Sequence, residues 1–142
     1  MTPLLAWFDG GKRRDKDVPA EYMAGSAVIQ LPDGDRRAFL KRCAALNSEE
    51  AEWEGALLAT KGILSYLNDP TEKRVSNVIL YGDCEAVIRV LQTRWDKPDE
   101  KTPGRILSTL YRAKRIDQHG VNYPQHKAGG LHLIHPMDVS IQ

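Results

Sequence analysis

The chain has 142 residues, 42% of them hydrophobic, which suits one compact domain over residues 1–142 with a substantial core. The formal net charge of +1 neither requires nor excludes a nucleic-acid partner, because a basic patch can lie on a nearly neutral protein. Two cysteines without C-x-x-C spacing, no signal sequence and no apolar run near the ~20 residues of a membrane span predict a cytoplasmic protein without membrane contact.

The first third of the chain predicts three strands. Residues 4–9 form an apolar run that ends on an acid, and residues 24–31 form a second run after a polar loop. Residues 32–35, PDGD, are a turn signal, and residues 36–46 return as a third strand. The second and third strands are therefore expected to form an antiparallel hairpin, with the first strand beside them.

Residues 49–67 predict the clearest element, an amphipathic helix whose apolar residues recur every three and four positions. Asn47 or Ser48 is expected to cap its N-terminus, and the glutamates of the first turn suit the positive end of the helix dipole. The apolar positions are Trp53, Ala56, Leu57, Thr60, Ile63, Leu64 and Leu67.

The rest of the chain predicts a strand, two helices and a last strand. Residues 76–83 form a strand whose continuous apolar centre is typical of a strand covered on both faces, and residues 84–95 begin a helix at once. After a Pro-rich break, residues 105–116 predict a further helix and residues 119–124 a fifth strand, whereas residues 125–142 show no strong periodicity. The order βββαβααβ predicts an α/β fold in which helices cover a mixed five-stranded sheet.

Three acids come from separate elements of this fold. Asp9 ends the first strand, Asp83 ends the fourth, and Glu52 lies in the first turn of the long helix, at the rim of its apolar stripe. They are expected to meet outside the carboxyl ends of the strands, where open α/β sheets bind ligands. Clustered carboxylates repel one another, and proteins use them chiefly to hold hard divalent cations. Each acid also has an ordinary explanation: a turn for Asp9, the helix dipole for Glu52 and a helix cap for Asp83.

Four motifs, in order, resemble type 1 ribonuclease H and the ribonuclease H-like domains of reverse transcriptases. They are WFDGG (7–11), AGSAVIQ (24–30), NSEEAEWEGALLA (47–59) and VILYGDCEAVIRVL (78–91). The resemblance extends over residues 4–95 and is looser beyond. It implies a ribonuclease H-like fold and a metal-dependent endonuclease that hydrolyses the RNA strand of RNA–DNA hybrids.

The resemblance also implies the site. Asp9, Glu52 and Asp83 correspond to the metal-binding catalytic acids of the family. They would hold two Mg²⁺ ions, with Mn²⁺ as an alternative, on either side of the scissile phosphate. One ion would lower the pKa of the attacking water, and the other would stabilise the leaving oxygen.

Two further site residues are implied near the C-terminus. Asp138 is the candidate for a fourth catalytic and metal-binding acid. Its surroundings differ from the alanine-rich last helix of the family, so His132 or His135 is an alternative ligand. His126 would move protons or help the product leave, since an imidazole titrates near neutrality, with a neutral structural histidine as the alternative.

Substrate contacts follow from the same resemblance. Small polar residues near the acids would read the 2′-hydroxyls of the RNA strand, and basic residues after the first strand would contact phosphates. The basic helical handle of some members is missing from residues 96–104, which predicts weaker hybrid binding, or a partner domain for an otherwise monomeric protein. The implied contacts are Gly10, Gly11, Asn47 and Ser48 for hydroxyls, and Lys12, Arg13 and Arg14 for phosphates.

Other functions stay open. One is a nuclease of the same fold that acts on a DNA junction or as an exonuclease. Another is a non-catalytic nucleic-acid-binding domain. This alternative would be favoured if Asp138 lay far from the other three acids. A zinc site built from His126, His132 and either His135 or Cys84 is a weaker alternative, because the H-x-x-H spacing has no supporting cysteine pair.

Overall fold

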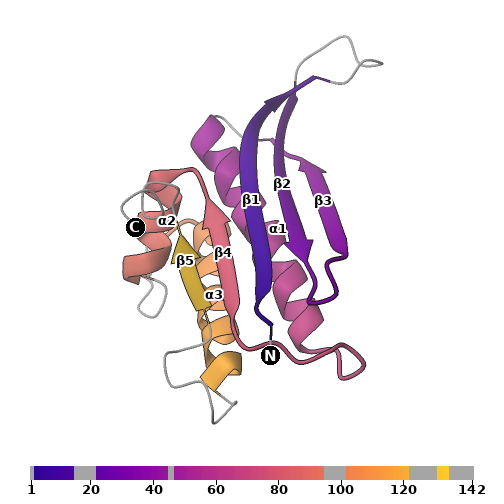
Figure 1. The fold of residues 1–142 in the computed structure, drawn as a ribbon. Helices are drawn as coiled ribbons and strands as arrows, with labels where there is room; N and C mark the ends of the chain where they lie inside the picture. The colour runs from indigo at the N-terminus through magenta and orange to yellow at the C-terminus, as the bar shows by residue number, and fades with distance from the viewer. Residues whose placement is uncertain (1, 15–21, 45–46, 95–101, 122–130, 135–142) are drawn as a thin grey trace.

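Five strands form one mixed sheet in the order β3-β2-β1-β4-β5 (Figure 1). The structure, a computed structural model, describes residues 2–14, 22–44, 47–94, 102–121 and 131–134. The strands are β1 (Leu4–Arg13), β2 (Tyr22–Gln30), β3 (Arg36–Arg42), β4 (Val78–Gly82) and β5 (Leu131–Ile134). β1, β2 and β3 pair antiparallel, whereas β4 is parallel to β1 and β5 is parallel to β4. The parallel pairing aligns β1 with β4, so the residues that follow Phe8 and Gly82 lie next to each other.

Three helices accompany the sheet: α1 (Ser48–Leu67), α2 (Glu85–Arg94) and α3 (Gly104–Val121). In Figure 1, α1 runs behind β1 and β2, α3 lies behind β4 and β5, and α2 lies beside β5. Of the two expected caps of α1, Asn47 is the one used, because its Oδ1 accepts a hydrogen bond from the Glu50 backbone N–H (2.9 Å). Among the described residues, no helix is both long and apolar enough to cross a membrane.

The core lies between the sheet and the helices behind it. Along β1, Leu4, Ala6 and Phe8 are buried, and the residues between them are partly exposed. β4 alternates in the same way, with Ile79 and Tyr81 partly exposed. This period of two indicates a sheet that the described helices cover on one face only. The expectation that β4 is covered on both faces is therefore wrong for the described part of the chain.

The predicted order βββαβααβ is confirmed, but the predicted position of the fifth strand is wrong. Residues 119–121 continue α3, residues 122–124 lie outside the described residues, and β5 is Leu131–Ile134. Extending an existing helix by a further turn costs little once it has nucleated, and a four-residue strand is too short to give a clear period of two. The Asp117 carboxylate accepts a hydrogen bond from the Leu131 backbone N–H (3.1 Å), which joins β5 to α3.

Candidate active site

The structure brings the three predicted acids together. Asp9 lies on β1, Asp83 directly follows β4, and Glu52 lies near the N-terminus of α1. Each offers a carboxylate oxygen, and these oxygens all lie within 4.8 Å of one another. Asp9 does not end its strand, because β1 continues to Arg13 in pairing with β2. A turn therefore does not explain this acid.

Close contact between α1 and the sheet positions Glu52. A Cβ on Gly10 would lie 2.1 Å from the Ala51 carbonyl carbon and 2.3 Å from the Glu52 backbone N, so only glycine fits there. A Cβ on Gly55 would likewise lie 2.2 Å from the Asp9 carbonyl oxygen. Glycines on both surfaces thus let the two backbones approach, and this contact places Glu52 beside Asp9.

Glu52 is the unusual acid of the cluster. It is only 8% exposed, and its Oε2 has no hydrogen-bond partner within the described structure. Burial raises the pKa of Glu52 from 4.5 to about 8, helped by a hydrogen bond with the Asp9 carboxylate and by the negative charges of Asp9 and Asp83. A hydrogen bond from the Gly10 backbone acts in the opposite direction. Without a cation, therefore, Glu52 holds a proton at neutral pH.

Asp9 is held by two donors. Its Oδ1 accepts a hydrogen bond from the Gly10 backbone N–H (2.8 Å), and its Oδ2 lies 3.3 Å from an Arg13 guanidinium nitrogen. Both partners lie on the same strand, so the carboxylate is oriented before any ligand arrives. The Arg13 pair is partly exposed to solvent and adds little to stability.

The cluster fits a divalent cation. Three carboxylates converge from three elements, and the Oε2 of Glu52, like that of Glu54 outside the cluster, is buried without a hydrogen-bond partner among the described residues, which leaves the Glu52 oxygen able to accept a ligand. Carboxylate oxygens are the ligands that Mg²⁺ and Mn²⁺ accept in proteins. Asp9, Glu52 and Asp83 are therefore the residues that would hold such an ion.

The other predicted residues have different positions. Gly11 is buried and Lys12 and Arg13 continue β1, while Arg14 follows that strand and is exposed. Ser48 is exposed at the start of α1. His132 pairs in register with Ile79 and is not part of the acidic group. Asp138, His126 and His135 lie outside the described residues.

Two aromatic residues beside the acids were missed by sequence reasoning. Trp7 and Tyr81 stack with ring centroids 5.4 Å apart and planes at 14°. Together with the acids that follow them, Asp9 and Asp83, they line a shallow hollow of about 200 Å³. The signal in the sequence was that each aromatic residue stands two positions before an acid, and therefore on the same face of its strand.

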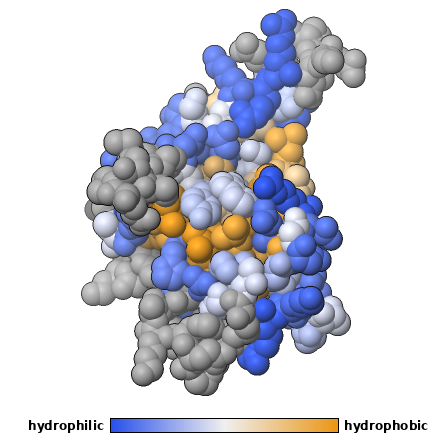
Figure 2. Space-filling view, viewed as in Figure 1, coloured by the Kyte–Doolittle hydropathy of each residue, from blue (hydrophilic) through white to orange (hydrophobic). Residues whose placement is uncertain are grey.

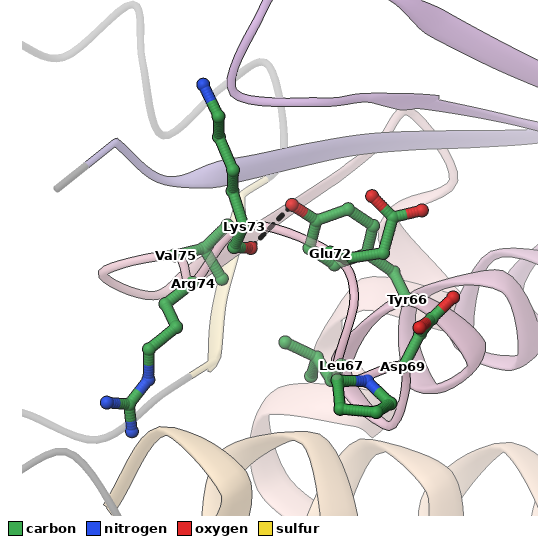
Figure 3. Close-up of a pocket in the computed structure, with 8 residues that line it drawn as sticks. Tyr66, Leu67, Asp69, Glu72, Lys73, Arg74 and Val75 are labelled. Carbon is green, nitrogen blue, oxygen red and sulfur yellow. Dashed lines mark hydrogen bonds between the residues drawn. The ribbon is translucent and has the colours of Figure 1, made fainter.

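A second hollow, of about 240 Å³, lies at the other end of α1 (Figure 3). The Tyr66 hydroxyl donates a hydrogen bond to the Lys73 carbonyl there (2.6 Å). Its acids already have local partners: Asp69 accepts hydrogen bonds from Thr71, and Glu72 pairs with Arg37 (2.6 Å). These contacts explain the hollow as loop packing.

Known structures resemble this chain, although no family model and no curated protein matches its sequence. One is ribonuclease H1 from the halophilic archaeon Halobacterium salinarum, with 15% identity and a TM-score of 0.54 over 97% of this chain and 89% of that chain. Another is the N-terminal ribonuclease H domain of Rv2228c from Mycobacterium tuberculosis (12% identity, TM-score 0.58, 99% and 88% covered). A third is LC11-RNase H1 from compost, solved in complex with an RNA/DNA hybrid (17% identity, TM-score 0.57, 93% and 83% covered). The fold is that of ribonuclease H.

The four sequence motifs predicted the ribonuclease H fold, and the comparisons confirm it at the level of architecture. At identities of 12–17%, the comparisons show a shared arrangement of helices and strands and do not show a shared activity. Within this ribonuclease H fold, the acids project from β1, α1 and the end of β4, which are the elements that the motifs predicted for them.

Proposed function

We propose that this protein is a metal-dependent endonuclease that hydrolyses the RNA strand of RNA–DNA hybrids. The observation that carries the proposal is the convergence of Asp9, Glu52 and Asp83 in a ribonuclease H fold, with one buried carboxylate oxygen that has no partner. Two structures similar to this chain were solved with an RNA/DNA hybrid: LC11-RNase H1 and a foamy viral protease-reverse transcriptase. The proposed active unit is a monomer in which residues 1–142 form a single domain.

Two Mg²⁺ ions, or Mn²⁺, held by these acids would supply the positive charge that activates a water and stabilises the leaving oxygen. The chain prepares that site in three ways. The Gly10 N–H and Arg13 fix the Asp9 carboxylate, burial keeps water away from Glu52, and the raised pKa of Glu52 keeps that acid neutral until a cation displaces its proton. From the resemblance, we assign Asp138 as a fourth ligand and His126 as a proton carrier.

Substrate contacts complete the proposal. Lys12, Arg13 and Arg14 extend from the acid-bearing strand and would contact phosphates. Of the residues expected to contact the 2′-hydroxyls of the RNA strand, Asn47 and Ser48 are exposed and would do so, whereas Gly10 packs against α1 and Gly11 is buried. Asn47 uses its side-chain oxygen in the helix cap, so its amide nitrogen is the donor that would reach a hydroxyl.

The test compares three labelled duplexes, an RNA–DNA hybrid, duplex RNA and duplex DNA, each with Mg²⁺ or with Mn²⁺. We expect cleavage of the hybrid RNA alone, lost in Asp9→Asn and in Glu52→Gln. Asp33→Asn is a matched control, because Asp33 is exposed in the turn before β3 and its Oδ1 accepts one backbone hydrogen bond that asparagine can also accept. This control should cleave at the wild-type rate.

Each of the other outcomes would contradict the proposal in a different way. Equal cleavage of duplex DNA would indicate a ribonuclease H-like nuclease of another substrate. Binding without cleavage under either metal would indicate a non-catalytic nucleic-acid-binding domain. Cleavage that survives in Asp9→Asn would remove the acidic cluster from the mechanism.

A further inference from the structure

The front face of the sheet extends from the proposed active site across β2 and β3. No described helix crosses β1, β2 or β3 on this face, whereas α1 covers the other (Figure 1). The alternation of β1 puts Trp7 and Asp9 on this face, since Ala6 and Phe8 point into the core. Apolar residues gather over the middle of the sheet, with hydrophilic residues toward the end of β1 and along β3 (Figure 2). Leu40 of β3 is 60% exposed here.

The charge of these strands is strongly one-sided. Their only acid is Asp9, against six cations: Lys12, Arg13, Arg36, Arg37, Lys41 and Arg42. Arg37 and Lys41 face acids of the helix side, Glu72 and Glu54. Among the described residues, Arg36 and Arg42 have no carboxylate partner, so their charges are available to a polyanion.

Both of these arginines are paired with aromatic rings. The Arg36 guanidinium lies 5.7 Å from the Trp7 ring centroid and donates a hydrogen bond to the Gln30 side chain (3.0 Å). Trp7 also stacks on Tyr81. Arg42 lies 4.2 Å from the Tyr22 ring centroid. Each guanidinium is therefore held in place while its charge stays exposed, which suits it to bind a phosphate.

The two arginine–aromatic units lie on either side of the acids. Arg42 lies six positions after Arg36 along β3, which is about 20 Å of strand. Ser26 and Leu40 pair in register between them and align with Asp9 on β1. The hollow beside Trp7 and Tyr81 opens next to the acids and is smaller than a typical ligand pocket of about 300–1,000 Å³, so it suits one flat ring system.

We infer that this face binds a single-stranded nucleic-acid segment that runs past the acids, with one base in the hollow lined by Trp7 and Tyr81 and phosphates on Arg36 and Arg42. Cations that follow the backbone and exposed rings that stack with bases are the recurring elements of single-strand binding. The bases of a duplex are already stacked on one another and cannot stack with a protein ring. The inference rests on the proposed function in one respect: the bound strand leads to the cleavage site, so hybrids with a single-stranded tail should be the preferred substrates.

The test measures the fluorescence anisotropy of a labelled 12-nucleotide poly-dT strand in EDTA at several salt concentrations. We expect Trp7→Leu to weaken binding about 10-fold, the size of one base–aromatic contact. Arg42→Gln should lower the slope of log K against log salt by about 0.7, as the loss of one phosphate contact predicts. Arg115→Gln, at an exposed position on α3 behind the sheet, is the matched control and should bind as the wild type does.

Equal binding by Arg42→Gln and the wild type would overturn the inference even if Trp7→Leu failed to fold, because Arg42 is exposed. The face would instead belong to a second copy of the chain if the wild type is a dimer, Leu40→Ser is a monomer, and the two proteins bind poly-dT equally. Cleavage of a blunt hybrid without poly-dT binding refutes this inference alone. Poly-dT binding without any hybrid cleavage refutes the proposed function alone.

Discussion

Replacing Glu52 by glutamine should change how the stability of the metal-free protein depends on pH. The wild-type side chain is buried beside two other acids, and its pKa in the folded protein is about 8 instead of 4.5. The folded state therefore binds this proton more tightly than the unfolded state does. Its contribution to stability is fully present below about pH 4.5 and is lost as the pH rises through about 8. The Glu52→Gln variant has no proton to lose.

The size of the effect follows from the two pKa values. Where the folded protein keeps the proton and the unfolded chain releases it, the free energy of unfolding falls by up to about 1.4 kcal/mol per pH unit. Between pH 6 and pH 8 the folded site passes from almost fully to half protonated, so the wild type should lose about 2 kcal/mol from this group. That loss is a large part of the ~5–15 kcal/mol by which a domain is typically stable.

Urea unfolding in EDTA at pH 6, 7 and 8 measures this loss. We expect the free energy of unfolding of the wild type to fall relative to that of Glu52→Gln by about 2 kcal/mol across this range. Asp33→Asn, which changes an exposed acid, should follow the wild type. Added Mg²⁺ should reduce the wild-type loss, because a cation that binds the ionised acids stabilises the folded state. Parallel pH profiles for the wild type and Glu52→Gln would refute the assignment of Glu52 as the proton-holding member of the cluster.

Three further substitutions test the scaffold. Glu54→Gln should lower the free energy of unfolding in urea by about 1.5–3 kcal/mol, because the Arg105 Nε–H donates a charged hydrogen bond to this buried carboxylate (2.5 Å). An unchanged free energy of unfolding would show that the pair does not stabilise the fold. Gly10→Ala should lower the free energy of unfolding by about 3 kcal/mol or more, because the added methyl group would push α1 away from β1. Gly104→Ala is the control and should be tolerated, since a Cβ there meets no atom within 4 Å. Equal thermal stability of the two variants would contradict the close contact between α1 and β1. Tyr66→Phe should cost about 1 kcal/mol in the same assay, through loss of the hydrogen bond drawn in Figure 3.

Much of the fold was readable from the sequence because its signals are local. The helical period of residues 49–67 and the turn at 32–35 each depend on a few neighbouring residues, and both predictions are confirmed. The fifth strand was assigned to the wrong residues because β5 has four residues and is defined by its pairing with β4, a contact that no local pattern records.

The site was predictable in its acids and not in their surroundings. The meeting of Asp9 and Asp83 was predicted on the assumption that each ends its strand, and it is confirmed although β1 continues past Asp9 to Arg13, because β1 and β4 are parallel and in register just before the two acids. Gly10 was expected to contact the 2′-hydroxyls of a substrate, but the space beside its Cα is filled by the backbone of Ala51 and Glu52. A glycine in a sequence shows that something comes close, and only the packed structure shows what it is.

Glu52 and Glu54 are two buried acids of α1 with opposite surroundings. Both lie on α1 and both are less than 10% exposed. Glu54 faces cations, Arg105 at 2.5 Å and Lys41 at 4.0 Å, which is the usual compensation for a buried carboxylate. Glu52 faces two more acids, Asp9 and Asp83, and Arg13 pairs with Asp9. A helix selected only for packing has no reason to bury an acid against two others. In the metal-free protein, a proton on Glu52 reduces the repulsion within the cluster, and the divalent cation that we propose would displace that proton.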